Sequence, residues 1–249
     1  MRGRAIRLSK PRRMVIDLLH FARKLPTLPV QRRVDIAALV AARAACRERP
    51  QWTAIFTKAY ALASDEFPAL RRAYVAFPWP RLYEYPISTA SIAFERDYQG
   101  EPSLFFHLFK DPAARSLTDL GREIRRVANA PIAEIKEFRR ALYIAGLPRP
   151  LRRLAWWVGL NLGRQRGNHF GTFGVSVYSA LSAESLHPLS PLTTLLNYGV
   201  IGDDGSVDVR IVYDHRVMDG ATIARVLARL GEILTGPLVD EIKSLEQAP

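Results

Sequence analysis

His215 and Asp219, a histidine and an aspartate four residues apart, are the pair in this sequence best suited to proton transfer. An imidazole of ordinary pKa, about 6.5, can accept a thiol or hydroxyl proton at neutral pH. The β-branched run before His215 predicts a strand, and the apolar spacing after Gly220 predicts a helix. We therefore expect His215 at a strand end, with Asp219 capping the helix or holding a neighbouring arginine. The same two residue types at this spacing also occur in ordinary surface turns.

The string around this histidine, Asp-His-Arg-Val-Met-Asp-Gly-Ala, resembles the signature of the 2-oxoacid dehydrogenase acyltransferases, whose fold is shared with chloramphenicol acetyltransferase. The resemblance implies that His215 is the general base. It would deprotonate the thiol of coenzyme A or of a dihydrolipoyl group, and the thiolate would then attack a thioester carbonyl. Asp219 would order the site without transferring the proton. Coenzyme A or acyl-coenzyme A is thus the implied substrate, and no metal is expected.

A second string, Gly171-Thr172-Phe173-Gly174-Val175-Ser176, resembles the Gly-Thr-Phe-Thr-hydrophobic-Ser strand of the same family. The resemblance implies that the Ser176 hydroxyl donates a hydrogen bond to the oxyanion of the tetrahedral intermediate. Such a donor is needed because base catalysis alone leaves much of the barrier in place. A serine in a strand is otherwise an ordinary outward-facing polar residue.

The charge of the chain is regional. The formal net charge is +12, and residues 1–50 carry thirteen Lys or Arg against three Asp or Glu. Residues 137–170 carry seven arginines against one glutamate, so the rest of the chain is acidic on balance. Basic surfaces attract coenzyme A phosphates and anionic lipid as well as nucleic acid, and no nucleic-acid-binding motif accompanies the charge. Nucleic acid is therefore not the expected partner.

The pattern of elements predicts an α/β fold, a two-layer sandwich around a mixed β-sheet. We expect one catalytic domain over residues 1–249, because this length does not require a split. Asp204-Gly205 indicates a hairpin between the last two strands. The expected helices are 36–47, 52–63, 117–127 and 221–234, and the expected strands are 87–94, 103–109, 171–178, 193–201 and 206–214.

Residues 131–170 depart from the family pattern and form a basic, amphipathic insertion. Within it, arginines flank an apolar run from Leu151 to Leu162 that is shorter than the roughly 20 residues needed to span a bilayer. One interpretation is an interfacial helix on an anionic membrane, with Trp156, Trp157, Arg152 and Arg153 at the lipid boundary. The other is a core-packing helix at a subunit contact whose arginines face water.

Two functions follow from these patterns. The first is a thiol-dependent acyltransferase with a small-molecule acyl donor and acceptor, which the resemblance implies is a homo-oligomer, a trimer with each active site between subunits. The second is a catalytically inactive trimeric scaffold, or a membrane-surface assembly protein. The sequence has no lipoyl domain or long Ala/Pro-rich linker, as expected of a stand-alone form. The single cysteine, Cys46, and the lack of a secretory signal pattern suggest a cytoplasmic protein, peripheral to a membrane in the interfacial interpretation.

Overall fold

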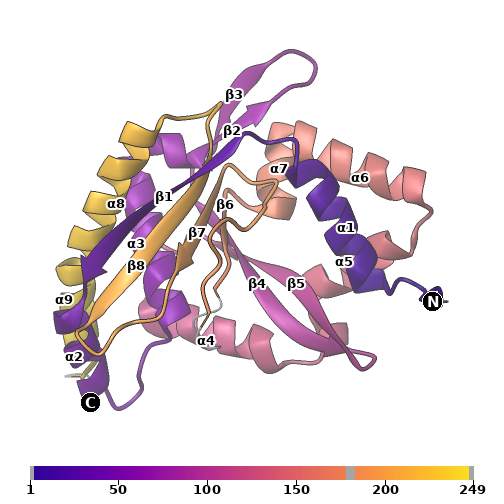
Figure 1. Cartoon of the computed structure of the whole chain (residues 1–249). Helices are drawn as coiled ribbons and strands as arrows, with labels where there is room; N and C mark the ends of the chain where they lie inside the picture. Colours follow the sequence, from indigo (N-terminus) through magenta and orange to yellow (C-terminus); the bar gives the residue numbers. More distant parts are fainter. Residues whose placement is uncertain (1–2, 178–182, 247–249) are drawn as a thin grey trace.

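A six-stranded mixed sheet forms the centre of the structure, a computed structural model that describes residues 3–177 and 183–246 (Figure 1). The strand order is β1-β8-β7-β6-β4-β5. β6 lies parallel to β4 and to β7, and the other neighbours are antiparallel. The strands are β1 (Thr27–Asp35), β4 (Thr89–Tyr98), β5 (Glu101–Lys110), β6 (Phe173–Val175), β7 (Thr194–Tyr198) and β8 (Ser206–Asp214).

One face of the sheet is covered by a layer of helices, which confirms the expected two-layer α/β sandwich. In β8, Val207, Val209, Ile211 and Tyr213 point into the core between the layers, as the alternation of a half-covered strand requires. The helices of this layer are α2 (Ala37–Ala45), α3 (Trp52–Glu66), α4 (Leu117–Asn129), α8 (Gly220–Thr235) and α9 (Pro237–Glu246).

Local signals account for the helices that the sequence predicts. Ser116 caps α4 by accepting a hydrogen bond from Asp119 N at 3.1 Å, and the apolar stripe of this helix is buried. Asp35 Oδ1 accepts a hydrogen bond from Ala37 N at 2.9 Å and so satisfies one free donor at the start of α2. The expected helices 52–63 and 221–234 correspond to α3 and α8.

Several elements were not expected from the sequence. The strand β1 lies at the sheet edge with most of its side chains exposed, so its residues show no clear alternation, and Pro29 is tolerated there. The sequence also did not predict the N-terminal helix α1 (Lys10–Ala22) or the separate hairpin of β2 (Arg72–Val75) and β3 (Arg81–Glu84). Short 3₁₀ turns occur at Pro68–Arg71 and Ile132–Glu134.

The strands around the candidate site are shorter than predicted. β7 ends at Tyr198 and β6 at Val175, and Tyr178, the last residue of the expected strand 171–178, lies outside the described residues. The predicted hairpin is present, because β7 and β8 are antiparallel neighbours joined by residues 199–205. Gly205 has φ of +76°, and a Cβ there would lie 2.6 Å from Ala37 Cα, so this turn requires glycine.

Residues 136–170 form three helices beside β5, on the same side of the molecule as α1 (Figure 1). They are α5 (Lys136–Gly146), α6 (Arg149–Asn161) and α7 (Gly163–Phe170). Asp17 of α1 is fully buried and accepts hydrogen bonds from Arg152 Nε at 2.5 Å and Arg153 Nε at 2.7 Å. The N-terminal helix is thereby fixed to the insertion.

This packing corrects the expectation for the lipid-facing residues of α6. Trp156 is buried and stacks on Phe21 of α1, whereas Trp157 is exposed. Arg152 is also buried, because its guanidinium is needed to neutralise Asp17. The inner side of α6 thus packs against the protein, and only its outer side remains accessible.

Candidate active site

His215 lies in a tight turn directly after β8. Its backbone N–H donates to Pro26 O at 3.1 Å, just before the edge strand β1 begins. Asp214, which is fully buried, accepts hydrogen bonds from Arg216 Nε at 2.9 Å and Nη2 at 2.7 Å. Buried Met218 anchors the other end of the turn. These contacts fix the backbone of the turn and leave the His215 imidazole projecting from it.

The His215 ring and the Asp219 carboxylate are neighbours, with Nδ1 and Oδ1 3.6 Å apart. This separation is longer than a hydrogen bond. Asp219 occupies the N-cap position of α8 without making a side-chain cap hydrogen bond, and the arginine of the turn binds Asp214 instead. Neither role proposed for Asp219 from spacing alone is therefore present. The side chains are 44% and 84% exposed, so the described part of one chain does not enclose them.

Ser176 follows β6 and is half-buried. Its backbone N–H donates to Leu196 O at 3.2 Å, and Asn197 Nδ2 donates to its carbonyl oxygen at 2.6 Å. Asn197 is paired with Arg210 of β8, and Arg210 in turn donates to Ser185 O at 2.5 Å and to Gln31 Oε1. Both Asn197 and Arg210 are buried, so a polar network on the sheet fixes the backbone at Ser176.

Ser176 and His215 lie at different ends of the sheet in one chain. Ser176 is level with the Asn197–Arg210 pair, and His215 is five positions beyond Arg210 along β8. Five residues at about 3.3 Å each, together with two strand spacings of about 4.8 Å, put the two residues on the order of 15–20 Å apart. A hydroxyl at that distance cannot bond an oxyanion formed beside His215 of the same chain.

Sequence reasoning missed two sets of supporting residues. Asn197 and Arg210 support Ser176, and a signal was present, since an arginine amid the β-branched residues of β8 needs a buried partner. At the other end, Arg216 stacks over the Tyr74 ring at 4.4 Å, and buried Arg166 of α7 donates to Pro191 O at 2.8 Å. No local pattern reveals these contacts, because the partners are distant in the sequence.

Burial favours the neutral form of the tyrosine beside His215. The rings of Tyr213 and His215 have centroids 5.5 Å apart. Burial, and after it the charge of Asp219, raises the pKa of Tyr213. Burial lowers the pKa of Arg166 from its usual high value, but a guanidinium stays charged in proteins. The charge of Asp214, directly before His215, partly offsets this lowering, so a buried cation of α7 lies near the start of the turn.

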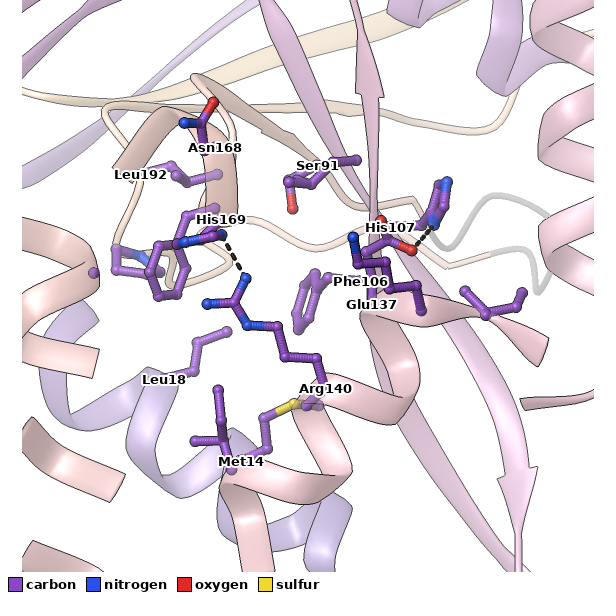
Figure 2. Close-up of a pocket in the computed structure, with 18 of the residues that line it drawn as sticks. Met14, Leu18, Ser91, Phe106, His107, Glu137, Arg140, Asn168, His169 and Leu192 are labelled. Atoms are coloured by element: carbon purple, nitrogen blue, oxygen red, sulfur yellow. Dashed lines mark hydrogen bonds and ion pairs between the residues drawn. The ribbon is translucent and has the colours of Figure 1, made fainter. Parts of the chain in front are cut away.

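Among the described residues, His215 lines neither of two large cavities that lie near the sheet. One of about 600 Å³ is lined by Val175 and Val177, which flank Ser176, and by Arg43 and Trp52. The larger, of about 740 Å³, lies between the sheet and helices α1, α5 and α6 (Figure 2). Within residues 3–177 and 183–246, no cluster of three or more His, Cys, Asp or Glu side chains could hold a metal ion.

The fold is shared with acyltransferases of known structure. The chain matches the dihydrolipoamide acetyltransferase of Azotobacter vinelandii with a TM-score of 0.69 and 18% identity, over 95% of this chain and 93% of that one. It matches the cubic core of the pyruvate dehydrogenase multienzyme complex with a TM-score of 0.66 and 19% identity, over 94% and 93%. Chloramphenicol acetyltransferase matches with a TM-score of 0.52 and 15% identity, over 92% and 96%.

No protein-family model and no curated protein sequence matches this chain. The structural matches confirm the chloramphenicol acetyltransferase-like fold expected from the strings around His215 and Ser176. The chain therefore has the fold of the 2-oxoacid dehydrogenase acyltransferase catalytic domain. In the Azotobacter vinelandii enzyme, a serine, a histidine and an asparagine four residues after the histidine have been investigated for roles in the catalytic mechanism.

Proposed function

We propose that the protein transfers an acyl group between coenzyme A, or another thiol, and a second small molecule. His215 accepts the thiol proton as the S–H bond breaks, and the thiolate forms a new bond to the thioester carbonyl carbon. When the old C–S bond breaks, the imidazolium returns its proton to the leaving thiolate. The observation that carries the proposal is the acyltransferase fold with a histidine and a carboxylate four residues apart after β8.

The separation of His215 and Ser176 supports a site shared between two copies of the chain. In one chain the serine is too far away to stabilise an oxyanion beside His215, and that histidine is 44% exposed. A second copy that brings its own Ser176 against His215 would supply the missing donor and exclude water. The match to a multienzyme core is consistent with homo-oligomeric assembly, and we propose a trimer.

Replacement of His215 tests the proposed base. A positioned general base contributes roughly 10²–10⁴-fold, so His215→Ala should reduce acetyl-coenzyme A exchange with a thiol acceptor by about that factor. Ser176→Ala should lower turnover on the order of 10²–10³-fold, with little change in substrate binding. His20→Ala, which removes a histidine on α1, is the matched control and should retain wild-type activity. If the exchange rate of His215→Ala stays within a factor of about ten of the wild type, His215 is not the base. If the wild type shows no exchange with acetyl or longer acyl donors, the alternative of a catalytically inactive scaffold is favoured.

Peripheral attachment to an anionic membrane is a second proposal, motivated by the outer surface of α1, α6 and α7. On α6, Leu151, Leu154, Trp157 and Val158 are exposed. The three helices contain one acidic residue, Asp17, which is buried. Arg12 pairs with Glu101 and Arg153 with Asp17, but the cations of the three helices outnumber these acids. Such a combination of exposed apolar residues with arginines suits anionic lipid headgroups.

The titration of His20 reflects the same concentration of positive charge. Partial burial, followed by the charges of Arg153, Lys24, Arg23 and Arg149, lowers the pKa of His20. Because like charges repel, this concentration of cations opposes contact between the surface of α1, α6 and α7 and the same surface of a second copy. No helix of the described residues is long and apolar enough to cross a bilayer.

Vesicle co-sedimentation tests the membrane proposal. The wild type should bind phosphatidylserine-containing vesicles in a salt-sensitive manner and phosphatidylcholine vesicles weakly. Leu154→Ser with Trp157→Ser should reduce binding to the anionic vesicles, while Leu28→Ser, which removes an exposed leucine from β1, should not. Arg149→Gln should weaken binding by about 1 kcal/mol. Equal recovery with both kinds of vesicle, or with neither, would rule out electrostatic attachment.

A further inference from the structure

The cavity of about 740 Å³ is separate from both His215 and Ser176 and is built largely by the insertion and α1. Its walls include apolar side chains from α1, α5, α6, α7 and the outer sheet face: Met14, Leu18, Phe106, Ile144, Trp156 and Phe170. Figure 2 shows Met14, Leu18 and Phe106 around the Arg140 side chain, which extends from α5 across the cavity. A volume of this size lies in the range of small-molecule sites, roughly 300–1,000 Å³.

The acids of the inner wall, of which Asp17 is buried and Glu123 and Glu137 are half-buried, already have partners. Asp17 binds Arg152 and Arg153. Glu123 Oε2 lies 2.5 Å from Arg115 Nη1, and Glu137 Oε2 lies 3.1 Å from His107 Nδ1. Glu134 is the remaining acid of the lining, and it is exposed at the rim. The acids of the inner wall therefore do not neutralise Arg140.

Arg140 is held in place by a neutral group. Its Nη1 donates to His169 Nδ1 at 2.6 Å, and among the described residues no carboxylate forms an ion pair with it. Burial, and after it the charge of Arg140, lowers the pKa of His169, so this ring is uncharged at neutral pH. The guanidinium keeps most of its five N–H donors for another partner.

We propose that this cavity binds a single-chain amphipathic carboxylate, with the chain against the apolar walls and the carboxylate on Arg140. A small inorganic anion would leave the apolar walls uncovered, and a neutral lipid would form no charge-assisted hydrogen bond with the guanidinium of Arg140, which is exposed. The planar fork of an arginine matches the two oxygens of a carboxylate. Binding at this site does not depend on acyl transfer and is measured without an acyl donor.

Calorimetric titration of the intact protein with dodecanoate tests the charge at Arg140. We expect one dodecanoate per chain, and Arg140→Met should weaken its binding about 10- to 100-fold, the effect of losing a charge-assisted hydrogen bond. Arg139→Met removes the same charge from the neighbouring position of α5, outside the lining, and should leave the affinity unchanged. Equal weakening by the two variants would overturn the site, because it would indicate general charge attraction.

Dodecanol and cavity-filling variants test the chain-binding part. The wild type should bind dodecanol more weakly than dodecanoate, and Arg140→Met should not change dodecanol binding. Ala155→Phe should abolish dodecanoate binding by filling the cavity. If Ala155→Phe lowers the melting temperature too far for the assay, Ala141→Leu fills the cavity with a smaller side chain. Unchanged dodecanoate binding in a natively folded filling variant, or equal affinity for dodecanol and dodecanoate in the wild type, would refute the proposal.

Discussion

Two inactive variants should restore activity when they assemble together. His215→Ala lacks the proposed base, and Ser176→Ala lacks the proposed oxyanion donor. Within one chain these residues are on the order of 15–20 Å apart, so each site must combine His215 of one copy with Ser176 of the next. A mixed assembly then contains sites in which the intact histidine of one variant meets the intact serine of the other.

The expected recovery follows from the arrangement. A cyclic trimer has three sites, each formed between two neighbouring chains. Whether it contains one or two copies of either variant, a mixed trimer has one site in which both His215 and Ser176 are intact. Mixed trimers should therefore show about one third of wild-type turnover per chain. A trimer of either variant alone should fall at least about 10²-fold below the wild type.

The assay uses two affinity tags, one on each variant, so that tandem purification isolates only mixed assemblies. The rate of acetyl-coenzyme A exchange by the mixed assemblies is then compared with the rate for assemblies of each single variant, prepared with both tags in the same way. Light scattering checks the assembly, because a species of 28.0 kDa at micromolar concentration would be a monomer. Mixed assemblies no more active than their parents would refute a site between subunits, and a clean monomer with full activity would refute it independently.

Two further predictions concern ion pairs in the lining of the larger cavity. Asp17→Asn leaves Arg152 buried without its counter-charge, so we expect the free energy of unfolding to fall by about 3–5 kcal/mol and the melting temperature to fall on the order of 10 °C. Exposed Asp203→Asn, the control, should change neither quantity. An unchanged melting temperature in Asp17→Asn would contradict the role of this ion pair. Hydrogen bonds from His107 and then Arg115 lower the pKa of Glu123 from 4.5 to about 2, so its contribution is present above pH 4.5 and is lost as the pH falls towards 2. Glu123→Gln should lower stability by about 1–2 kcal/mol at pH 7 and flatten its decline between pH 5 and pH 2, while Glu95→Gln should follow the wild-type curve in urea unfolding.

The sequence alone determined the elements whose signals are local. The strand, turn and helix around His215 follow from a β-branched run, a polar turn and an apolar helical stripe, all within 28 residues from Val207 to Leu234. The cap at Ser116 and the break at Asp204-Gly205 are likewise set by neighbouring residues. Such signals depend on backbone geometry and side-chain reach over a few positions, so they can be interpreted without the fold.

Tertiary structure decided which of these residues meet. The register of β6, β7 and β8 separates Ser176 from His215, although both lie in strings of the same family pattern. Packing of α6 on α1 turned Trp156 and Arg152 inward and left Trp157 outside, because Asp17, 135 positions from Arg152, required a buried partner. The cavity around Arg140 has the same origin, since its walls come from segments far apart in the chain. Long-range contacts of this kind depend on the free energy of burying particular side chains together, which no local pattern of residues encodes.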